Sequence, residues 1–484
     1  MLREKPLEIP EIVVQVVSYL GRDDHTKCVR VSKRWRDMFL PHIWREVSVF
    51  EDYRNSPSPQ DLYPHRHLVQ NLSLNDGELF ELGTFIYPNL RSLEICDYQE
   101  FGCPVETVSV DLTKTCPSLT HLRIVGYIVA TTTWMTLSAL PHIKSLDLSG
   151  IHIEAIAAPW FWKVCERLED LRMRESSIEG TIPEDLMFKR LRELFMSCNS
   201  GMDEEVQMDL VYRSTMLESL EWDHNAYGEG ETGRLIRHPI LNNHWPNLHK
   251  LQIILNIQDA ELACFLRGAG NGQGIITEFE SSFSELGTQA SKDLSLHFNT
   301  LVSVDISQCK TSTRSTVPDI LCSCPNLKDL RVGSVFAKDI AECGPWVCQQ
   351  LRSLMICFRV GNSGQCLQLH QMIFERLSTL IQLKSLTLCI PDLDDVVEGI
   401  LEFRLEYGLG QLASLQELST IEFSRGHYQD YEPQLGMEEV AWMAGNWKQL
   451  EAIGGCLHSD ERMESQLATR IQSLGIRYGK MHAY

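Results

Sequence analysis

The sequence predicts an α/β solenoid, in which short parallel strands form a curved sheet with helices on its outer face, preceded by a small helical domain. Three observations indicate this fold. A nine-residue motif recurs along the chain, its copies follow one another at a period of about 26 residues, and two helical stripes of apolar residues occupy the first fifty positions. At 484 residues the chain is also too long for one ordinary hydrophobic core.

The composition is that of a folded chain. Its apolar fraction of 43% is sufficient for burial, and no apolar run is long enough to cross a membrane. The opening residues are too polar for a signal peptide, so we expect a soluble, unsecreted protein that is cytoplasmic and/or nuclear. The sixteen cysteines are spread through the chain, which is typical of reduced, buried thiols.

The net charge of −21 is unevenly distributed. The first fifty residues carry nine Lys or Arg and seven Asp or Glu, so the excess of acid lies in the remainder. Such an acidic body repels phosphate backbones, which argues against nucleic acid as a partner. The charge either attracts a basic protein or only keeps a large surface soluble.

The recurring motif places an apolar residue first, another three positions later and a third two positions after that. Two clear copies are Cys-Pro-Ser-Leu-Thr-His-Leu-Arg-Ile (116–124) and Cys-Pro-Asn-Leu-Lys-Asp-Leu-Arg-Val (324–332). A degraded copy at Ile276, Phe279 and Ser281 fills the one double-length gap. The good copies begin at Leu90, Leu119, Ile143, Leu168, Leu191, Leu217, Leu248, Leu301, Leu327, Leu351 and Leu383.

The spacing within the motif predicts a strand. The second and third apolar residues are two positions apart, so they point to the same face, and the residues between and beside them point to the other. One such strand cannot bury its apolar face alone, whereas parallel neighbours share a continuous core. The segments between the strands look helical and often stop at a proline such as Pro325.

This pattern resembles the leucine-rich repeat, specifically the longer cysteine-containing type, over roughly residues 67–460. The resemblance implies a concave sheet and a convex layer of helices. We expect residues 51–66 to be a polar, proline-bearing linker and residues 461–484 to be a C-terminal cap or tail.

Residues 1–50 form a separate unit in this prediction. Pro10 can begin a helix, and two apolar stripes at helical spacing follow it. So short a helical segment must pack on the repeats or on another protein. The first stripe contains Ile12, Val13, Val16, Val17 and Leu20, and the second contains Cys28, Val31, Trp35, Met38 and Phe39.

This segment resembles an F-box in the order of its elements: Pro-Glu-Ile (10–12), Tyr-Leu (19–20), Val-Ser-Lys-Arg-Trp (31–35) and Ile-Trp-Arg-Glu-Val (43–47). It departs from the usual Leu-Pro-x-Glu opening, because Pro10 directly precedes Glu11. The family uses such apolar positions to bind the small adaptor subunit of cullin-RING ubiquitin ligases. The resemblance therefore implies adaptor binding by Ile9, Pro10, Ile12, Val13, Val16, Leu20, Val31, Trp35 and Trp44.

An F-box followed by leucine-rich repeats implies the substrate-recognition adaptor of an SCF-type ubiquitin ligase, which is a non-catalytic subunit. The alternative is a repeat protein that scaffolds or inhibits a partner without a ligase. In that case the first fifty residues are a cap, and Val16, Trp35 and Trp44 are buried within the chain.

We expect no catalytic residue, cofactor or metal. Cys322, Cys324, Cys343 and Cys348 lack the two-residue spacing of a zinc knuckle. The glycine-rich segment 268–274 lacks the Lys-Ser ending of a phosphate-binding loop, which favours an excursion between repeats.

A target protein would bind the outward positions of the sheet. The best candidates combine charges with an aromatic side chain, as interface hot spots do. Alternatively, these residues are ordinary surface, and Phe195 is buried within a repeat of shifted register. The candidates are Arg123, Asp147, Arg172, Arg174, Phe195, Glu221 and Asp223.

Overall fold

The structure is a computed structural model of the 484-residue chain. Its residues form two compact units, 1–216 and 217–484, and each unit is described by itself. Among the described residues, no helix has the length and apolar character needed to cross a membrane. The structure describes residues 10–49, 59–75, 85–96, 107–108, 111–126, 128–197, 201–223, 245–311, 313–361, 366–389, 399–424 and 433–479.

The first unit begins with three helices. They are α1 (Pro10–Tyr19), α2 (Arg22–Cys28) and α3 (Lys33–Arg45). The Ser32 side chain caps α3 by accepting a hydrogen bond from the Trp35 backbone N–H at 3.2 Å. Val17 and Phe39 form the buried centre of this helical group.

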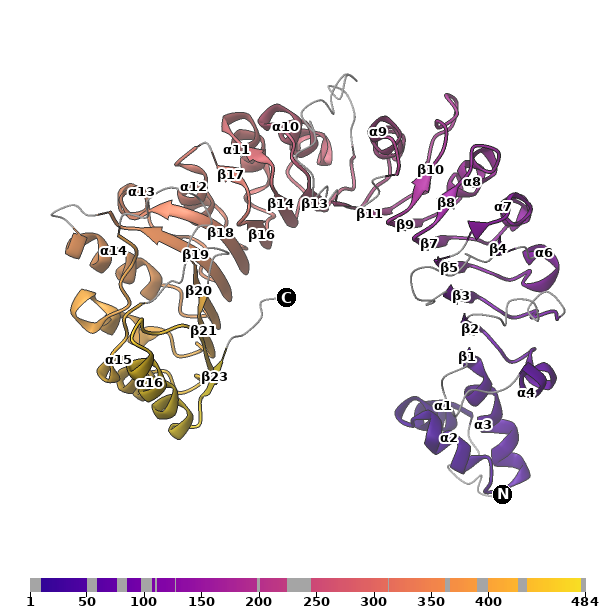
Figure 1. The fold of residues 1–484 in the computed structure, drawn as a ribbon, viewed down its shortest axis with the longest axis horizontal. Helices are drawn as coiled ribbons and strands as arrows, with labels where there is room; N and C mark the ends of the chain where they lie inside the picture. Colours follow the sequence, from indigo (N-terminus) through magenta and orange to yellow (C-terminus); the bar gives the residue numbers. More distant parts are fainter. Residues whose placement is uncertain are drawn as a thin grey trace, which may run out of the picture. The chain divides into compact units, whose positions relative to one another are not determined.

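Parallel strands follow the helices. Each strand of this sheet pairs with the strand of the same sheet that comes next along the chain. Helices and short turns lie behind it, so that helices line one side of the strands in Figure 1. The strands are β1 (Glu46–Val49), β2 (Asn71–Asn75), β3 (Ser92–Cys96), β5 (His121–Val125), β7 (Ser145–Ser149), β9 (Asp170–Arg174) and β11 (Glu193–Ser197). The helices are α4 (Pro59–Leu62), α6 (Leu112–Thr115), α7 (Thr131–Ala139), α8 (Ala158–Cys165) and α9 (Glu204–Arg213).

The second unit repeats this arrangement, and its strands also pair in parallel. The strands are β12 (Ser219–Asp223), β13 (Lys250–Ile254), β14 (Glu278–Ser282), β16 (Ser303–Ile306), β18 (Asp329–Phe336), β19 (Ser353–Arg359), β20 (Ser385–Cys389), β21 (Thr420–Ser424), β22 (Ala452–Gly455) and β23 (Arg477–Gly479). The helices are α10 (Asp259–Gly268), α11 (Thr288–Leu294), α12 (Thr316–Ser323), α13 (Ala337–Glu342), α14 (Cys366–Ser378), α15 (Met437–Asn446) and α16 (Glu461–Ser473).

Shorter elements complete the repeats. The 3₁₀ turns include η2 (Tyr63–His65), η4 (Gly270–Gly272), η5 (Ser295–His297), η6 (Leu405–Tyr407) and η7 (Leu409–Ser414). Two-residue strands pair parallel behind the main sheets: β4 (Thr107–Val108) with β6 (Ile128–Val129), β8 (His152–Ile153) with β10 (Ser177–Ile178), and β15 (Glu285–Leu286) with β17 (Lys310–Thr311).

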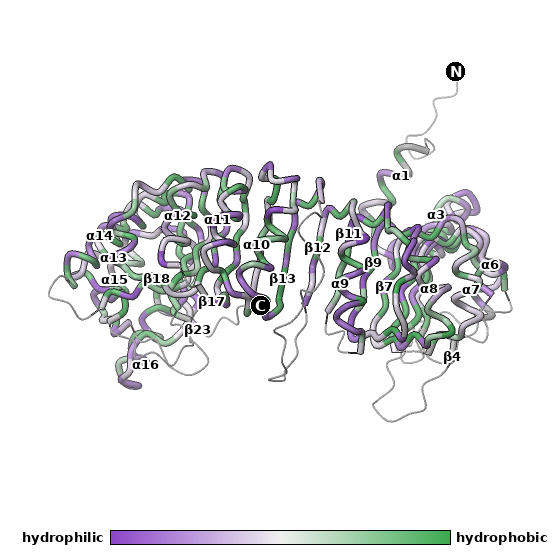
Figure 2. Tube along the Cα trace, turned by 90° about the horizontal axis from the view of Figure 1, so that it is seen from above, coloured by the Kyte–Doolittle hydropathy of each residue, from purple (hydrophilic) through white to green (hydrophobic). Residues whose placement is uncertain are grey.

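The core of each unit follows the predicted repeat. The leading residue of every good copy is buried, and Leu119, Leu168 and Leu327 have no exposed surface. Hydrophilic and hydrophobic residues alternate along the first four residues of β13 (Figure 2). The degraded copy forms β14 as an ordinary member of the sheet. These features confirm the predicted class, a leucine-rich-repeat solenoid behind a small helical domain.

The ends of the sheets differ from the predicted boundaries. Strand β1 lies before residue 50 and pairs parallel with β2, with Glu46 opposite Asn71. The chain from 461 onward supplies α16 and β23, and β23 pairs with β22. Both edges extend because each terminal strand satisfies backbone groups that the neighbouring strand would otherwise leave unpaired. The predicted array of 67–460 also divides, between Met216 and Leu217, into the two units.

Candidate functional site

The helical group α1–α3 holds part of the predicted adaptor-binding set in its own core. Leu20 and Trp35 pack against the Val17 and Phe39 cluster, and the Trp35 ring stacks on the Phe39 ring at 5.3 Å. Their spacing along the helices produces this packing, because residues three and four apart share one helical face. Both side chains are therefore half-buried supports of the helical group.

Other apolar side chains of this group face solvent. Val31 is 64% exposed and Tyr19 is 82% exposed. Tyr19 does not belong to either predicted apolar stripe. A large apolar residue outside the stripes is the feature of the sequence that could have indicated a surface contact. Ile12 and Val16 are half-buried. Of the remaining predicted residues, Ile9 lies outside the described part, and the side chains of Pro10 and Val13 are not described.

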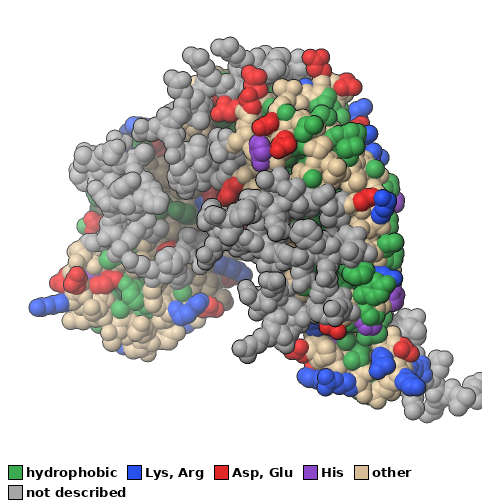
Figure 3. All heavy atoms as spheres, turned by 45° about the vertical axis from the view of Figure 1, so that its right-hand side comes forward, with side chains coloured by type: hydrophobic (Ala, Val, Ile, Leu, Met, Phe, Trp, Pro, Cys, Tyr) green, Lys and Arg blue, Asp and Glu red, His purple; other side chains and the backbone are tan. Residues whose placement is uncertain are grey.

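Trp44 joins the helical group to the segment before the sheet. Its ring stacks on the His65 ring, with 4.5 Å between centroids and 21° between planes. Burial, followed by the nearby charge of His67, lowers the pKa of His65. Because protonation would place charge beside a half-buried ring, the lowered pKa favours the neutral, stacked imidazole. Lys and Arg side chains are spread over the neighbouring surface of α1–α3 (Figure 3).

The first unit brings together five of the predicted target-binding residues. In the register of its sheet, Arg123, Asp147, Arg172 and Phe195 are successive neighbours on β5, β7, β9 and β11. Arg174 follows two residues after Arg172, on the same outward side of β9. The alternation of buried and outward residues continues through β11, so Phe195 is an outward residue of a regular repeat and does not lie inside a shifted one.

Most charges on this face are paired with one another. Asp147 lies 3.6 Å from the Arg123 Nε atom and 3.5 Å from the Arg174 Nη1 atom. Arg172 contacts Glu193 at 3.2 Å. Burial acts to lower the pKa of Arg172, but the carboxylates of Asp170 and Glu193 together outweigh it and raise that pKa. These exposed pairs add little to stability, but they hold the guanidinium groups in defined positions.

Phe195 has its own cationic partner on this face. The Arg174 guanidinium lies over the Phe195 ring, 4.8 Å from its centroid. Arg174 therefore joins the acidic Asp147 on one side to an aromatic ring on the other. The half-buried ring and its stacked cation form a partly apolar spot within an otherwise charged face.

Glu221 and Asp223 lie on β12 and belong to the second unit. The predicted set is thus divided between the two units. Glu221 aligns through Gln252 with Glu280 and Asp305 in the register of the second sheet. Burial, followed by the negative charges of Asp305 and Glu221, raises the pKa of Glu280. The second unit therefore presents an acidic stretch on this part of its sheet.

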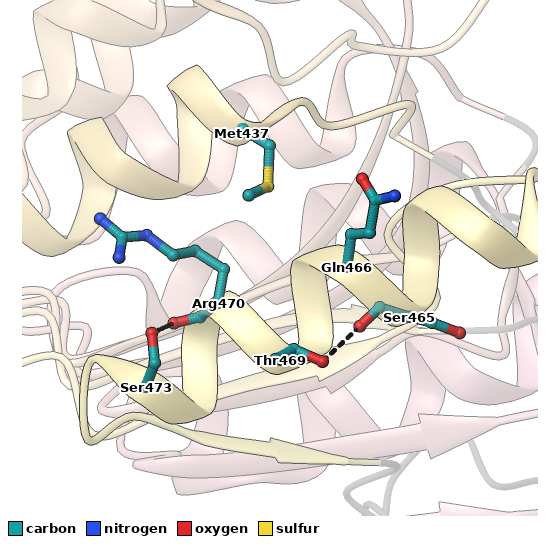
Figure 4. Close-up of a pocket in the computed structure, with 6 residues that line it drawn as sticks. All are labelled: Met437, Ser465, Gln466, Thr469, Arg470 and Ser473. Atoms are coloured by element: carbon teal, nitrogen blue, oxygen red, sulfur yellow. Dashed lines mark hydrogen bonds between the residues drawn. The ribbon is translucent and has the colours of Figure 1, made fainter.

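A shallow pocket of about 480 Å³ lies on the helical side of the second unit, between α15 and α16. Its lining consists of Met437, Ser465, Gln466, Thr469, Arg470 and Ser473, drawn in Figure 4. All three hydroxyls of this lining donate to carbonyls of their own helix: Ser465 to Glu461 at 2.8 Å, Thr469 to Ser465 at 2.8 Å and Ser473 to Arg470 at 2.6 Å. This lining lacks the acid and base pair of a hydrolytic site.

Two of the cysteines near α12 donate hydrogen bonds to one backbone carbonyl. Among the described residues, no group of three or more His, Cys, Asp or Glu could hold a metal ion. Cys322 and Cys343 both donate hydrogen bonds to the Gly344 carbonyl oxygen, at 3.3 and 3.4 Å. Burial and the neighbouring thiol raise the pKa of Cys322 to about 12. Cys322 is therefore a neutral thiol at physiological pH.

The first part of the chain matches a known protein family. Residues 10–49 match the sequence profile of the F-box-like family. The solved structures similar to this chain include a leucine-rich-repeat protein of Leptospira interrogans, with 12% identity, a TM-score of 0.41, and coverage of 83% of this chain and 97% of that one. Another is the plant peptide hormone receptor RGFR1 in complex with RGF2, with 10% identity, a TM-score of 0.39, and coverage of 91% and 75%. No curated protein sequence matches the chain.

Proposed function

We propose that this chain, with an F-box-like domain at residues 10–49 ahead of leucine-rich repeats, is the substrate-recognition subunit of an SCF-type ubiquitin ligase. In this role the helices α1–α3 bind the ligase adaptor subunit, and the outward face of the repeats binds the protein to be ubiquitinated. The subunit itself is non-catalytic, and it acts in the cytoplasm or the nucleus.

The observation that carries this proposal is the coincidence of the F-box-like match with α1–α3. Tyr19 and Val31 expose large apolar side chains there, although the group has a buried centre available. Side chains of this kind lose contact with water when a partner covers them, which stabilises a complex.

The face of the first sheet supports the target-binding half of the proposal. Its paired arginines and the Arg174 and Phe195 contact combine fixed hydrogen-bond donors with an aromatic ring. Arg and aromatic residues are enriched at the centres of protein interfaces.

A second candidate function, a repeat scaffold without a ligase, is favoured by one specific observation. Trp35 and Trp44 find partners within the chain, on Phe39 and His65. In that function α1–α3 serve as a cap that covers the first edge of the sheet.

Binding of the purified adaptor subunit to the full chain separates the two functions. We expect micromolar or tighter binding by the natural chain and at least a tenfold loss on Val31→Asp, because the new carboxylate would lose its water in the complex. Ile381→Asp is the matched control, since Ile381 is 57% exposed in the second unit. An unchanged far-ultraviolet spectrum and melting curve would show that Val31→Asp still folds. Absence of binding by the natural chain would leave the scaffold function.

A further inference from the structure

Strands β18 and β19 extend beyond the usual five residues of a repeat strand and are drawn as two long neighbouring arrows in Figure 1. The register between them shifts between Arg331 and Ser334, where Gly333 approaches the Ser307 carbonyl oxygen. A side chain at Gly333 would place its Cβ atom 2.9 Å from that oxygen. After this bulge the pairing resumes, and it places Phe336 beside Arg359.

Phe336 is 39% exposed and is contacted by two guanidinium groups. The Cζ atom of Arg314 lies 4.6 Å from the ring centroid, and that of Arg359 lies 5.7 Å from it. Arg359 comes from the neighbouring strand, whereas Arg314 comes from the turn before α12. Three separate segments of the second unit therefore meet at one ring.

The turn that carries Arg314 is fixed by hydroxyl groups. The Ser291 hydroxyl lies 2.7 Å from that of Thr316 and 3.2 Å from that of Thr313. Thr316 is buried, with 2% of its surface exposed. Because Thr313 and Thr316 flank Arg314 and are tied to α11, the backbone position of Arg314 is set before any ligand binds.

Neither guanidinium is paired with an acid among the described residues. Within the part of the chain that the structure describes, no carboxylate lies within ion-pair distance of Arg314 or Arg359, including that of Asp339 on α13. The Nε atom of Arg359 is buried without a hydrogen-bond partner. By contrast, Arg123, Arg172 and Arg174 of the first unit all have carboxylate partners.

Contact with the ring leaves the N–H groups of these arginines able to donate, apart from the buried Nε–H of Arg359. The N–H groups of a guanidinium lie in its plane, so an aromatic ring against its face blocks none of them. Two such groups around one ring provide a local double positive charge with donors suited to oxyanions. Acidic groups more than about 8 Å away weaken this charge only slightly, because they are largely screened at physiological ionic strength.

We infer that Arg314, Phe336 and Arg359 form a recognition site for an oxyanion, either a carboxylate or a phosphoryl group, carried by a segment of a protein partner. The guanidinium groups bind the oxyanion, and the exposed edge of Phe336 contacts the apolar part of the same segment. The site thus gives the chemical class of the target in the proposed function. The inference rests on the proposed function only where it treats the partner as a target of the ligase.

The test is fluorescence anisotropy of the full chain with three labelled peptides of equal length. One contains two phosphoserines, one has glutamates at those positions, and one has serines. We expect the phosphorylated or the glutamate peptide to bind at least tenfold more tightly than the serine peptide. The Arg314→Gln and Arg359→Gln double variant should lose at least tenfold of that affinity, and Phe336→Leu about threefold. Which of the two anionic peptides binds distinguishes phosphoryl from carboxylate recognition, and competition by inorganic phosphate reports a site that accepts the free anion.

The matched control is the Arg352→Gln and Arg470→Gln double variant. It removes the same charge from the second unit, and Arg352 lies just before β19, about 23 Å from Arg359 in the direction of the strand. Equal loss of binding in both double variants, or equal binding of the three peptides by the natural chain, would overturn the inference. Adaptor binding is measured separately, so failure here and failure of the proposed ligase function are distinguishable.

Discussion

The Nε2 atom of His297 lies 2.8 Å from the carbonyl oxygen of Leu266 and ties two successive repeats of the second unit together. The Nδ1 atom of the same ring accepts hydrogen bonds from the backbone N–H groups of Ile275 and Ile276, at 3.0 and 3.3 Å. His297 is fully buried. One imidazole thus satisfies three backbone groups, which requires the neutral form with its proton on Nε2.

His297→Leu should therefore destabilise the second unit by about 3 kcal/mol or more, because it leaves those backbone groups buried without partners. The expected observation is a lower urea midpoint, followed by tryptophan fluorescence. A midpoint within error of that of the natural chain would show that water replaces the imidazole.

His297 also makes stability depend on pH. Burial lowers its pKa in the folded state below the ordinary value of 6.5, despite the opposing effects of the Leu266 carbonyl and Asp293. The unfolded chain consequently binds more protons between the lowered pKa and 6.5, so stability falls as the pH drops through that window. Urea titrations at several pH values should show this fall, and it should be smaller in His297→Leu.

Gly274→Ala should destabilise the same region by about 2 kcal/mol or more. Gly274 has a φ of +47°, and a Cβ atom there would lie 1.9 Å from the Leu296 carbonyl oxygen. Hydrogen exchange should become faster around η4 and η5. Gly344→Ala is the control, because no atom lies within 4 Å of a Cβ at that position. Equal effects of the two changes would contradict this reading.

Phe39→Ala should unfold the α1–α3 group selectively. Phe39 is 2% exposed and supports Val17 and Trp35. Removal of a buried phenylalanine costs about 3–5 kcal/mol, which a group this small cannot tolerate. Limited proteolysis should then cleave within residues 10–45 while the second unit stays protected. Protection of both regions would mean that the sheet, rather than its own core, stabilises the helical group.

Arg174→Ala should change stability by about 1 kcal/mol or less, because its ion pair with Asp147 is partly exposed. Leu171→Ala, on the buried side of the same strand, should cost about 2–5 kcal/mol. Urea midpoints of the two variants provide the comparison. A large effect of Arg174→Ala would mean that the outward charges stabilise the sheet instead of serving recognition.

The repeat pattern predicted the strands well because burial on a strand has a period of two residues. Leu122 and Ile124 are buried on β5, whereas His121 and Arg123 face outward, as the motif requires. Even the degraded copy at 276–281 kept enough apolar surface to form a strand. The alternation of buried and outward residues is set by positions next to one another in the chain. It can therefore be recognised in the sequence.

Two segments show where local reasoning failed. The glycine-rich stretch 268–274, predicted as an excursion, is built into the repeat, and the Gly270 N–H donates to the Trp245 carbonyl at 3.0 Å. In the predicted linker, Leu62 is buried and His65 stacks on Trp44. In both cases contacts with distant residues order a segment whose composition alone indicates a loop.

The sequence by itself determined which residues enter the core, the parallel strands they form and the helical group ahead of them, because apolar periodicity is a local property of the chain. Only the tertiary structure decided which outward side chains meet. Arg174 stacks on Phe195, and Arg314 and Arg359 converge on Phe336, through the register of separate strands and a single bulge. Polar contacts form only when two groups lie within a few ångströms of each other. Whether they do depends on how segments far apart in the chain pack together, which no short stretch of sequence encodes.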